Sequence, residues 1–575
     1  MLLRLTIVLL LLAGVLIAPF AFRPGDETAD LKKSNSERLV IITPHNESIQ
    51  SEFARGFVAH MKQNHQRDVF VDWRQPGGTS EIARFLRSEF ATRFETLWKK
   101  ETGLPFSLTA REAYANGKLD SRLAETKTQQ GSAQQSKAAN LTGLDRNDKD
   151  QVALASRNLF LESDTGVGID LFFGGGAYDF NKQASAGNLV GVSADGKYGP
   201  GALAKEKPDW FSDEIMPATV SGEPFRDEDF RWVGTVLSAF GICYNTDVLD
   251  RLGINEPFTS WSDLGNPKLF GQVALADPTK SGSTTKAFEM LIQEKIQHRL
   301  TTGGGSEAES IAAGWDDAMQ LILKISANSR YFTDSAAKVP RDVAMGDAAA
   351  GMCIDFYGRT FNELYRRDNG SDSRVQFLMP VGGTSIGADP IGMLRGAPNP
   401  ELAHRFVEYV LSPEGQKLWN YKAGSPNGPT RFALRRPPIR KDFYSEENRK
   451  FMTDPDVNPY EISKGFTYHP EWTGALFASL RFVIKASCID PHEEQQEAWR
   501  TLIEAGMPRG GAEEFEDISL INYSETTNRI AEVLAEKDKI KEITLARELS
   551  GHFRARYEAI TSKWNTHQLT AAETK

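Results

Sequence analysis

The stretch Asp277-Pro278-Thr279-Lys280-Ser281-Gly282-Ser283-Thr284 is a short polar turn between two apolar segments. Ala274-Leu275-Ala276 before it predicts a buried strand, and the periodic run 286–293 after it predicts a helix. A helix start presents unpaired N–H groups and a partial positive charge, so such a turn suits an oxyanion. Its serine and threonine hydroxyls add donors, and its glycine allows close approach. Taken alone, the segment favours an ordinary capped turn, so the interpretation depends on its surroundings.

Length and composition describe a globular chain with room for more than one domain. The chain has 575 residues, of which 40% are hydrophobic and 25% charged, so two or three domains with full cores are expected. A net charge of -10 argues against bulk nucleic-acid binding. Three cysteines form no disulfide framework and fit no zinc-site spacing, so we expect buried thiols at Cys243 and Cys353.

The N-terminal segment 1–22 carries one charge, Arg4, followed by an unbroken apolar run. This pattern predicts a secretory signal peptide or, because no clear cleavage site follows, an uncleaved N-terminal anchor. The polar segment 23–37 then reads as a tether. Both alternatives predict a periplasmic or extracytoplasmic protein.

Strand and helix patterns alternate from residue 38 onward. A strand at 38–43 precedes a helix at 47–63 and a second strand at 69–73, and Pro76-Gly77-Gly78-Thr79-Ser80 opens another helix whose apolar side has Ile82, Phe85 and Leu86. This βαβα order predicts a parallel sheet with helices on its faces. Ligand groups then gather at the carboxyl ends of the strands, where His45 and Thr79-Ser80 fall.

Several later segments predict a chain that passes between two lobes. Residues 88–160 interrupt the alternation and read as an insertion, helical at first and low in periodicity near 128–150. A buried strand at 169–173 then runs into Gly174-Gly175-Gly176. The extended run 231–245 is too long for one ordinary strand and is interpreted as a crossing from one lobe to the other, with the return at 375–380.

These patterns together predict six parts. They are a signal peptide or anchor at 1–22, a tether at 23–37, a first lobe at 38–238 with its insertion at 88–160, a second lobe at 239–376, a return to the first lobe at 377–440, and a mainly helical C-terminal extension at 441–575.

The ordered motifs resemble extracellular solute-binding proteins of ABC importers, and most of all the group that includes ferric-iron and phosphate-ester binders. The resemblance covers 38–87 and 165–435, and no single motif is specific. Its motifs are Pro76-Gly77-Gly78-Thr79-Ser80, Asp170-Leu171-Phe172-Phe173-Gly174-Gly175, Tyr244-Asn245 with Leu249, Trp261-Ser262-Asp263-Leu264, Asp277-Pro278 with Ser281-Gly282-Ser283, Ala397-Pro398-Asn399-Pro400 and Leu411-Ser412-Pro413-Glu414-Gly415-Gln416.

The resemblance implies an α/β, two-lobed type 2 periplasmic binding protein fold with two hinge-crossing strands. A helical insertion and a helical C-terminal extension are added to it. The implied function is capture of a small anionic solute, either a phosphate-bearing metabolite or ferric iron with a synergistic anion, by hinge closure. The expected partner is an ABC transporter permease in the membrane, with a monomeric binding protein and no nucleic acid. The alternatives are a membrane-tethered sensing module and an enzyme on the same fold, although no catalytic motif or catalytic residue is recognised.

The expected ligand-binding residues lie on both sides of the cleft that the resemblance implies. They are Thr43, His45, Gly78, Thr79, Ser80, Gly175, Ser281, Gly282, Ser283, Thr284, Asp355 and Tyr357. In the iron alternative His45 and Tyr357 are the metal ligands, although Phe356 stands where these binders have a second tyrosine. Asp355 has a second interpretation as the ion-pair partner of Arg359. No cofactor is expected, and Fe3+ enters only as transported ligand.

The C-terminal extension contains one apolar stripe at helical spacing. Its members are Leu549, Phe553, Tyr557, Ile560 and Trp564. A stripe of this width is typical of a helix that docks on the body of its own domain.

Overall fold

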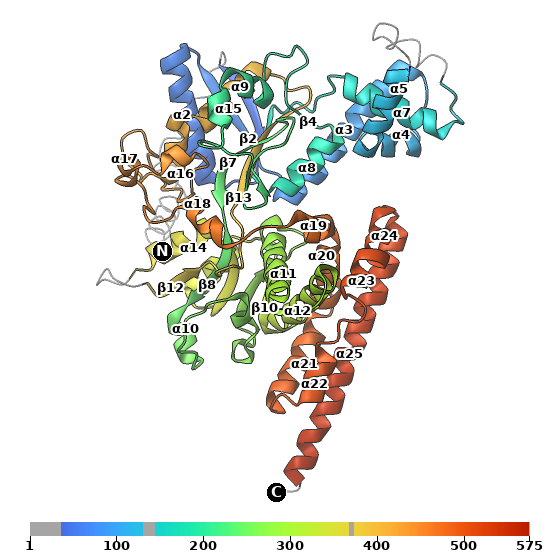
Figure 1. Ribbon diagram of the computed structural model, residues 1–575, viewed down its shortest axis with the longest axis vertical. Helices are drawn as coiled ribbons and strands as arrows, with labels where there is room; N and C mark the ends of the chain where they lie inside the picture. The colour runs from blue at the N-terminus through green and yellow to red at the C-terminus, as the bar shows by residue number, and fades with distance from the viewer. Residues whose placement is uncertain (1–35, 130–143, 367–372, 574–575) are drawn as a thin grey trace, which may run out of the picture.

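Two separate β-sheets organise the computed structural model, which describes residues 36–129, 144–366 and 373–573. The predicted N-terminal segment 1–22 and the tip of the insertion at 130–143 lie outside the described residues. Figure 1 shows the sheets one above the other, each flanked by helices. We call the part around the upper sheet the first lobe and the part around the lower sheet the second lobe. This arrangement confirms the predicted α/β class and its two-lobed fold.

The first lobe contains a six-stranded sheet. Its strands are β1 (Glu37–Ile42), β2 (Val69–Arg74), β3 (Leu171–Phe173), β4 (Leu189–Val190), β7 (Val233–Ser238) and β13 (Gly387–Leu394). Strand β1 pairs in parallel with β2 and β3, whereas β13 runs antiparallel to β3, β4 and β7. The lobe's longer helices are α2 (Glu47–His65), α3 (Thr79–Thr102), α8 (Ala177–Ala186), α9 (Pro200–Glu206), α15 (Pro400–Leu411) and α16 (Pro413–Asn420). A short hairpin, β5 (Thr219–Val220) and β6 (Glu223–Pro224), faces the second lobe.

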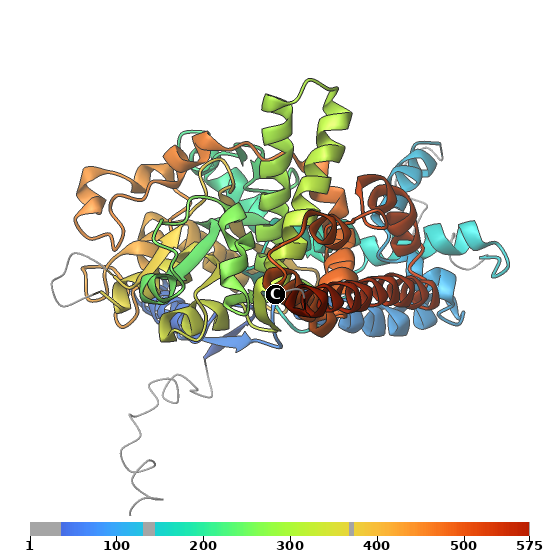
Figure 2. The same cartoon turned by 90° about the horizontal axis from the view of Figure 1, so that it is seen from below.

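The second lobe contains a five-stranded sheet in the order β10-β9-β11-β8-β12. Its strands are β8 (Phe240–Asn245), β9 (Val273–Ala276), β10 (Ser329–Thr333), β11 (Ala350–Ile354) and β12 (Val375–Leu378). Its helices are α10 (Thr246–Arg251), α11 (Gly282–Thr302), α12 (Glu307–Asn328), α13 (Lys338–Met345) and α14 (Asp355–Leu364). Figure 2 shows the hairpin of α11 and α12 projecting beyond the rest of this lobe.

Two strand connections cross between the lobes, as the long extended run predicts. Only Ala239 separates β7 in the first sheet from β8 in the second. The chain returns between β12 and β13, where the hydroxyl of Thr384 accepts a hydrogen bond from the N–H of Phe240. The two crossings therefore lie side by side, as a hinge requires.

The insertion consists of helices at the far end of α3. They are α4 (Leu108–Ala113), α5 (Asp120–Gln129) and α7 (Lys149–Glu162), which stand out from the first lobe in Figure 1. Helix α3 runs without a break from the lobe boundary into the insertion, and its buried side carries Phe90, Phe94 and Trp98. Phe85, which the spacing assigned to the apolar side, is 37% exposed, because the buried positions follow a four-residue spacing from Ile82.

The C-terminal extension packs mainly on the second lobe. Its elements are α17 (Glu446–Arg449), α18 (Pro459–Ile462), α19 (Pro470–Thr473), α20 (Phe477–Ile484), α21 (His492–Glu504), α22 (Arg509–Phe515), α23 (Tyr523–Glu525), α24 (Ala531–Ala535) and α25 (Lys539–Glu573). The predicted stripe on α25 is buried from Leu549 to Ile560 and joins the same core as Trp315 and Ile322 of α12. The docking interpretation of this helix is therefore confirmed.

The extension also makes a third passage between the lobes, near Tyr468. The N–H of Tyr468 donates to the carbonyl of Ser221 in the first lobe, and its hydroxyl donates to Glu289 of α11 in the second. The next residue, His469, bonds through its N–H to the side chain of Gln293 on α11. Figure 1 shows this connecting segment between α18 and α19.

A buried charged cluster lies where this passage meets both lobes. The Nζ atom of Lys286 is 2.8 Å from Oε1 of Glu223 and 2.9 Å from Oε2 of Glu289, and it lies 3.6 Å from the centre of the Tyr468 ring. Thr473 donates a further hydrogen bond to Glu289. Burial alone lowers the pKa of Lys286, but attraction from the two carboxylates outweighs it and raises that pKa overall. The cluster thus couples both lobes and the extension.

Candidate functional site

The carboxyl ends of β1, β2 and β3 bring His45, Thr79 and the triple glycine together. A Cβ atom on Gly174 would lie 2.4 Å from the His45 ring, and one on Gly175 would lie 2.6 Å from Cγ2 of Thr79. Both glycines have positive φ, at 92° and 121°, a region that residues with side chains adopt at a cost. Glycine is therefore required at both positions because the side chains of His45 and Thr79 lie so close to the backbone. The sequence alone leaves two interpretations of the triple glycine open, a close approach and a simple tight turn.

The start of α11 faces the first lobe across the interlobe boundary. Ser281 caps the helix by accepting a hydrogen bond from the N–H of Thr284, so its hydroxyl has the ordinary structural role as well. A Cβ atom on Gly78 would lie 3.3 Å from the carbonyl oxygen of Lys280, and one on Gly282 would lie 3.9 Å from Oδ2 of Asp179. The turn at 277–284 thus lies against the α3 and α8 starts of the other lobe.

His45 is buried beside a charged pair that the sequence did not indicate. Its Nε2 atom is 3.6 Å from Oδ2 of Asp389, and Nη1 of Arg436 is 2.7 Å from the same oxygen. Burial lowers the pKa of His45, although Asp389 opposes the shift, so the ring is neutral at pH 7. Burial would raise the pKa of Asp389, but Arg436 and His45 lower it overall. Arg436 therefore keeps this carboxylate ionised.

Asp355 and Tyr357 lie at the start of α14. Asp355 forms an ion pair with Arg359 and accepts the N–H of Phe356 at 2.8 Å, which matches the structural alternative for this carboxylate. Burial raises the pKa of Asp355. Burial raises the pKa of Tyr357, and the nearby side chain of Asn46 in the first lobe opposes that shift. Tyr357 therefore reaches across to the segment that holds His45.

The hydroxyl of Thr43 is hydrogen-bonded, whereas the hydroxyl of Ser80 has no hydrogen bond to any residue that the structure describes. The Thr43 hydroxyl accepts a hydrogen bond from the N–H of His45 at 3.0 Å and so shapes the end of β1. Ser80 is 8% exposed at the start of α3, and its hydroxyl has no hydrogen-bond partner among the described residues. Within the part of the chain that the structure describes, both ring nitrogens of His45 and Nη2 of Arg481 likewise have no hydrogen-bond partner. Buried polar groups are nearly always paired, so an added acceptor or donor beside these atoms would be favoured.

The C-terminal extension adds residues that sequence reasoning missed. The ring of Phe477 on α20 lies 4.3 Å from the ring of Tyr178 on α8, across the lobe boundary. Burial raises the pKa of Asp179, and Arg481 and Lys182 oppose that shift. A lone arginine inside the apolar run of α20 is the sequence signal that would have drawn attention to Arg481.

No group of three or more histidine, cysteine, aspartate or glutamate side chains suited to a metal ion occurs among residues 36–129, 144–366 and 373–573. The cysteines Cys243, Cys353 and Cys488 are buried free thiols, as expected for the first two. His45 and Tyr357 approach one region, but Arg436 adds a fixed positive charge there.

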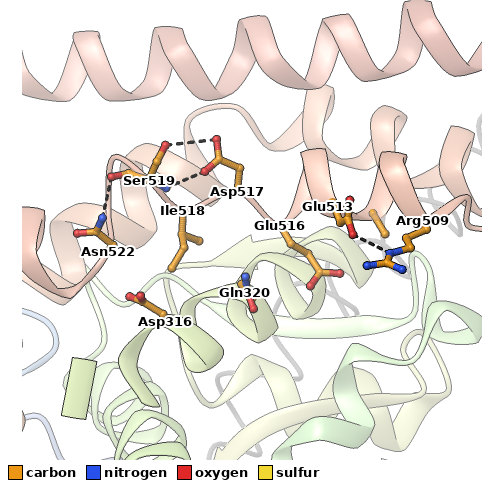
Figure 3. A pocket seen from close by; sticks show the side chains of 10 residues that line it. Asp316, Gln320, Arg509, Glu513, Glu516, Asp517, Ile518, Ser519 and Asn522 are labelled. Atoms are coloured by element: carbon orange, nitrogen blue, oxygen red, sulfur yellow. Dashed lines mark hydrogen bonds and ion pairs between the residues drawn. The ribbon is translucent and has the colours of Figure 1, made fainter. Parts of the chain in front are cut away.

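Three cavities lie away from the lobe boundary. The one in Figure 3, of about 610 Å³, is lined by α12 and the α22 region, including Asp316, Glu513 and Glu516. Its acidic groups are already engaged, since Glu516 pairs with Lys324 and Glu513 with Arg509. The others, of about 900 and 380 Å³, lie within the first and the second lobe, respectively. None of the three contains a predicted site residue.

One helical stretch of the described residues, Pro470–Ile489, is long and apolar enough to cross a membrane. It is largely buried against the second lobe, with Leu480, Val483 and Ile484 in the core. The stretch is therefore a core element by its packing.

Residues 211–452 match the sequence model of a family described as bacterial extracellular solute-binding protein. The phosphoglycerate transport regulatory protein PgtC of Salmonella typhimurium is 23% identical over 186 residues, which are 32% of this chain and 40% of that protein. The putrescine-binding periplasmic protein PotF of Escherichia coli is 27% identical over 222 residues, or 37% of this chain and 55% of that protein. The chain thus spans about half the length of these curated relatives.

Among solved structures, the periplasmic binding protein AfuA from Actinobacillus pleuropneumoniae, with fructose-6-phosphate bound, is similar. The TM-score is 0.40 at 18% identity, and the alignment covers 66% of this chain and 81% of AfuA.

Proposed function

We propose that this chain, whose residues 211–452 match a family of bacterial extracellular solute-binding proteins, captures a small anionic solute for an ABC importer. The solute is a phosphate-bearing metabolite, held between the lobes and enclosed by hinge closure. The observation that carries this proposal is the position of the α11 start, which lies against Gly78 of the other lobe. A ligand bound there contacts both lobes at once and therefore favours the closed form.

The chemistry of the α11 start favours an anion. The first N–H groups of a helix and its dipole attract negative charge, and Ser281 and Ser283 add hydroxyl donors, whereas the Thr284 hydroxyl already donates to Oγ of Ser281. From the first lobe, Thr79 and Ser80 begin α3 and present a second helix start. Two helix starts that converge on one region attract a phosphate group more strongly than either does alone.

The charges around the boundary also oppose a cationic solute. Asp355 is paired with Arg359, and Asp389 is paired with Arg436, so these carboxylates are already neutralised. A polyamine needs unpaired carboxylates, and one carboxylate at the boundary, Asp179, lies near Arg481 and Lys182. We therefore favour an anion over a polyamine.

The test is isothermal titration of the full-length chain in mild detergent with glycerol 3-phosphate and with glycerol. Binding of the phosphate ester alone is expected. Ser283→Glu, at the second position of α11, should abolish binding because it adds a carboxylate at the phosphate position. Ala308→Glu is the matched control, since it adds the same charge at the second position of α12, where the residue is exposed. Unchanged binding by Ser283→Glu would reject the anion site.

Ferric iron with a synergistic anion is the second candidate solute. Its support is the proximity of Tyr357 to the side chain of Asn46, which directly follows His45. Phenolate and carboxylate oxygens suit Fe3+, and Arg436 beside Asp389 disfavours it. Elemental analysis of freshly purified protein distinguishes the two solutes: stoichiometric iron supports the metal, and its absence with bound phosphate supports the ester.

We further propose that the chain works outside the cytoplasm, with a membrane permease as its partner, and that it binds its solute without turning it over. Incubation with glycerol 3-phosphate should leave the ester intact, and release of phosphate would favour an enzyme instead. A sensing module remains the other alternative, and dependence of solute uptake on the chain distinguishes import from sensing.

A further inference from the structure

Arg481 is a charged residue of the C-terminal extension that lies beside the start of α11, where the phosphate position is proposed. It belongs to α20, beyond the matched region 211–452. Its Nε atom donates a hydrogen bond of 2.9 Å to the hydroxyl of Thr285 in the first turn of α11. The Thr285 hydroxyl also bonds to the carbonyl of Pro278 at 2.8 Å. The guanidinium group is thereby tied to the same turn that would hold the anion.

Aromatic rings hold the guanidinium group at the lobe boundary. Its central carbon lies 4.8 Å from the Phe477 ring and 5.8 Å from the Tyr178 ring of the first lobe. Nη2 lies 3.7 Å from the position that a Cβ atom on Gly282 would occupy. Glycine at that position leaves Nη2 beside the bare backbone of the helix start.

Nη2 of Arg481 is buried and has no hydrogen-bond partner in residues 36–129, 144–366 and 373–573. An unpaired N–H of a charged group is costly to bury, so the local structure favours an acceptor beside it. Ser80, also buried and unpaired at the start of α3, faces the same requirement independently from the first lobe.

The surrounding charges leave an excess of positive charge for such an acceptor. Arg481 is attracted by Asp179 and Glu81 and repelled by Arg84, while Lys182 lies close to Asp179. Glu81 already pairs with Arg84 at 2.9 Å. Because Glu81 is paired with Arg84, the single negative charge of Asp179 is shared by two cations, Arg481 and Lys182.

We propose that Arg481 is a ligand-binding residue, and that the C-terminal extension completes the site by donating from this guanidinium to the phosphate of a phosphate monoester. This inference rests on the proposed function and narrows it to dianionic phosphate groups, because a guanidinium fork matches phosphate oxygens in charge and geometry. The extension is then a part of the binding site and more than an added support for the second lobe.

The decisive measurement is titration of full-length Arg481→Gln with glycerol 3-phosphate. Its affinity should fall about 10- to 100-fold, the range expected for loss of one charge-assisted hydrogen bond. Arg481→Lys keeps the charge without the fork and should bind with intermediate affinity. Arg500→Gln, on an exposed face of α21 in the same extension, is the matched control and should bind as the wild type does.

Hydrogen exchange of the wild-type chain gives a second measurement that needs no variant. Glycerol 3-phosphate should slow exchange in both 278–285 and 477–485. Slowing in 278–285 alone, or an unchanged affinity of Arg481→Gln, overturns the inference while the proposed function stands. If the wild-type chain binds no phosphate ester, the proposed function fails and the inference fails with it.

Discussion

Replacing Lys286 with methionine tests whether the buried charged cluster joins the lobes to the extension. The substitution leaves Glu223 and Glu289, which are 4% and 1% exposed, without their shared cation. Two buried carboxylates this close do not both stay ionised, so one takes up a proton. Protonating a glutamate with an ordinary pKa of about 4.3 costs about 4 kcal/mol at pH 7 and about 1 kcal/mol at pH 5. The variant should therefore lose about 3–5 kcal/mol of stability at pH 7.

The stability of the Lys286→Met variant should depend on pH, because one of its two buried glutamates binds a proton in the folded state. At pH 7 the folded state binds one proton more than the unfolded state, so stability falls as the pH rises from 5 to 7. Urea unfolding followed by tryptophan fluorescence at both pH values measures this difference. Lys324→Met is the control, because Lys324 and Glu516 form a pair of similar length, 2.8 Å, nearer the surface. An equal loss at both pH values, or a loss below about 1 kcal/mol at pH 7, would refute the reasoning.

Three further substitutions test the site and its support. His45→Gln should flatten the fall in melting temperature between pH 6.5 and 5, because the depressed pKa of buried His45 makes the unfolded state bind the extra proton there; identical profiles would contradict this. Gly175→Ala should cost about 1–3 kcal/mol and weaken glycerol 3-phosphate binding by displacing Thr79, so an unchanged melting temperature and affinity would count against it. Glu52→Gln should cost about 1.5–3 kcal/mol in urea unfolding, because the buried carboxylate accepts three backbone N–H groups at 430–432; a neutral effect would show that these bonds contribute little.

The features predicted correctly from sequence are local or periodic. A strand, a polar turn and a helix start follow one another around Ser281, and each leaves its own pattern of side chains. The crossing at Ala239 was visible because an extended run longer than one strand has to serve two sheets. The stripe on α25 was visible because Leu549, Phe553 and Tyr557 recur at one helical spacing.

The features that were missed depend on contacts between distant segments. Arg436 lies in an irregular stretch and Asp389 in a strand, and neither has a local pattern that announces their pairing. The unbroken length of α3 was missed although no glycine or proline interrupts 79–102, because the insertion was judged to begin where the β and α alternation stopped. Arg481 acquires its role only when α20 folds back on α11, 196 residues away in the chain from Thr285.

The passage at Tyr468 limits how far the molecule can open. Two adjacent linkers permit a wide swing about the line through them, whereas a third linker, bonded through Tyr468 to Ser221 and to Glu289, restrains that swing. We therefore expect a short stroke, with the unliganded protein spending much of its time near the shape that accepts the solute. Apparent affinity scales with the fraction of molecules in the binding-competent conformation. The third passage therefore raises the apparent affinity for a scarce solute without making any contact with that solute.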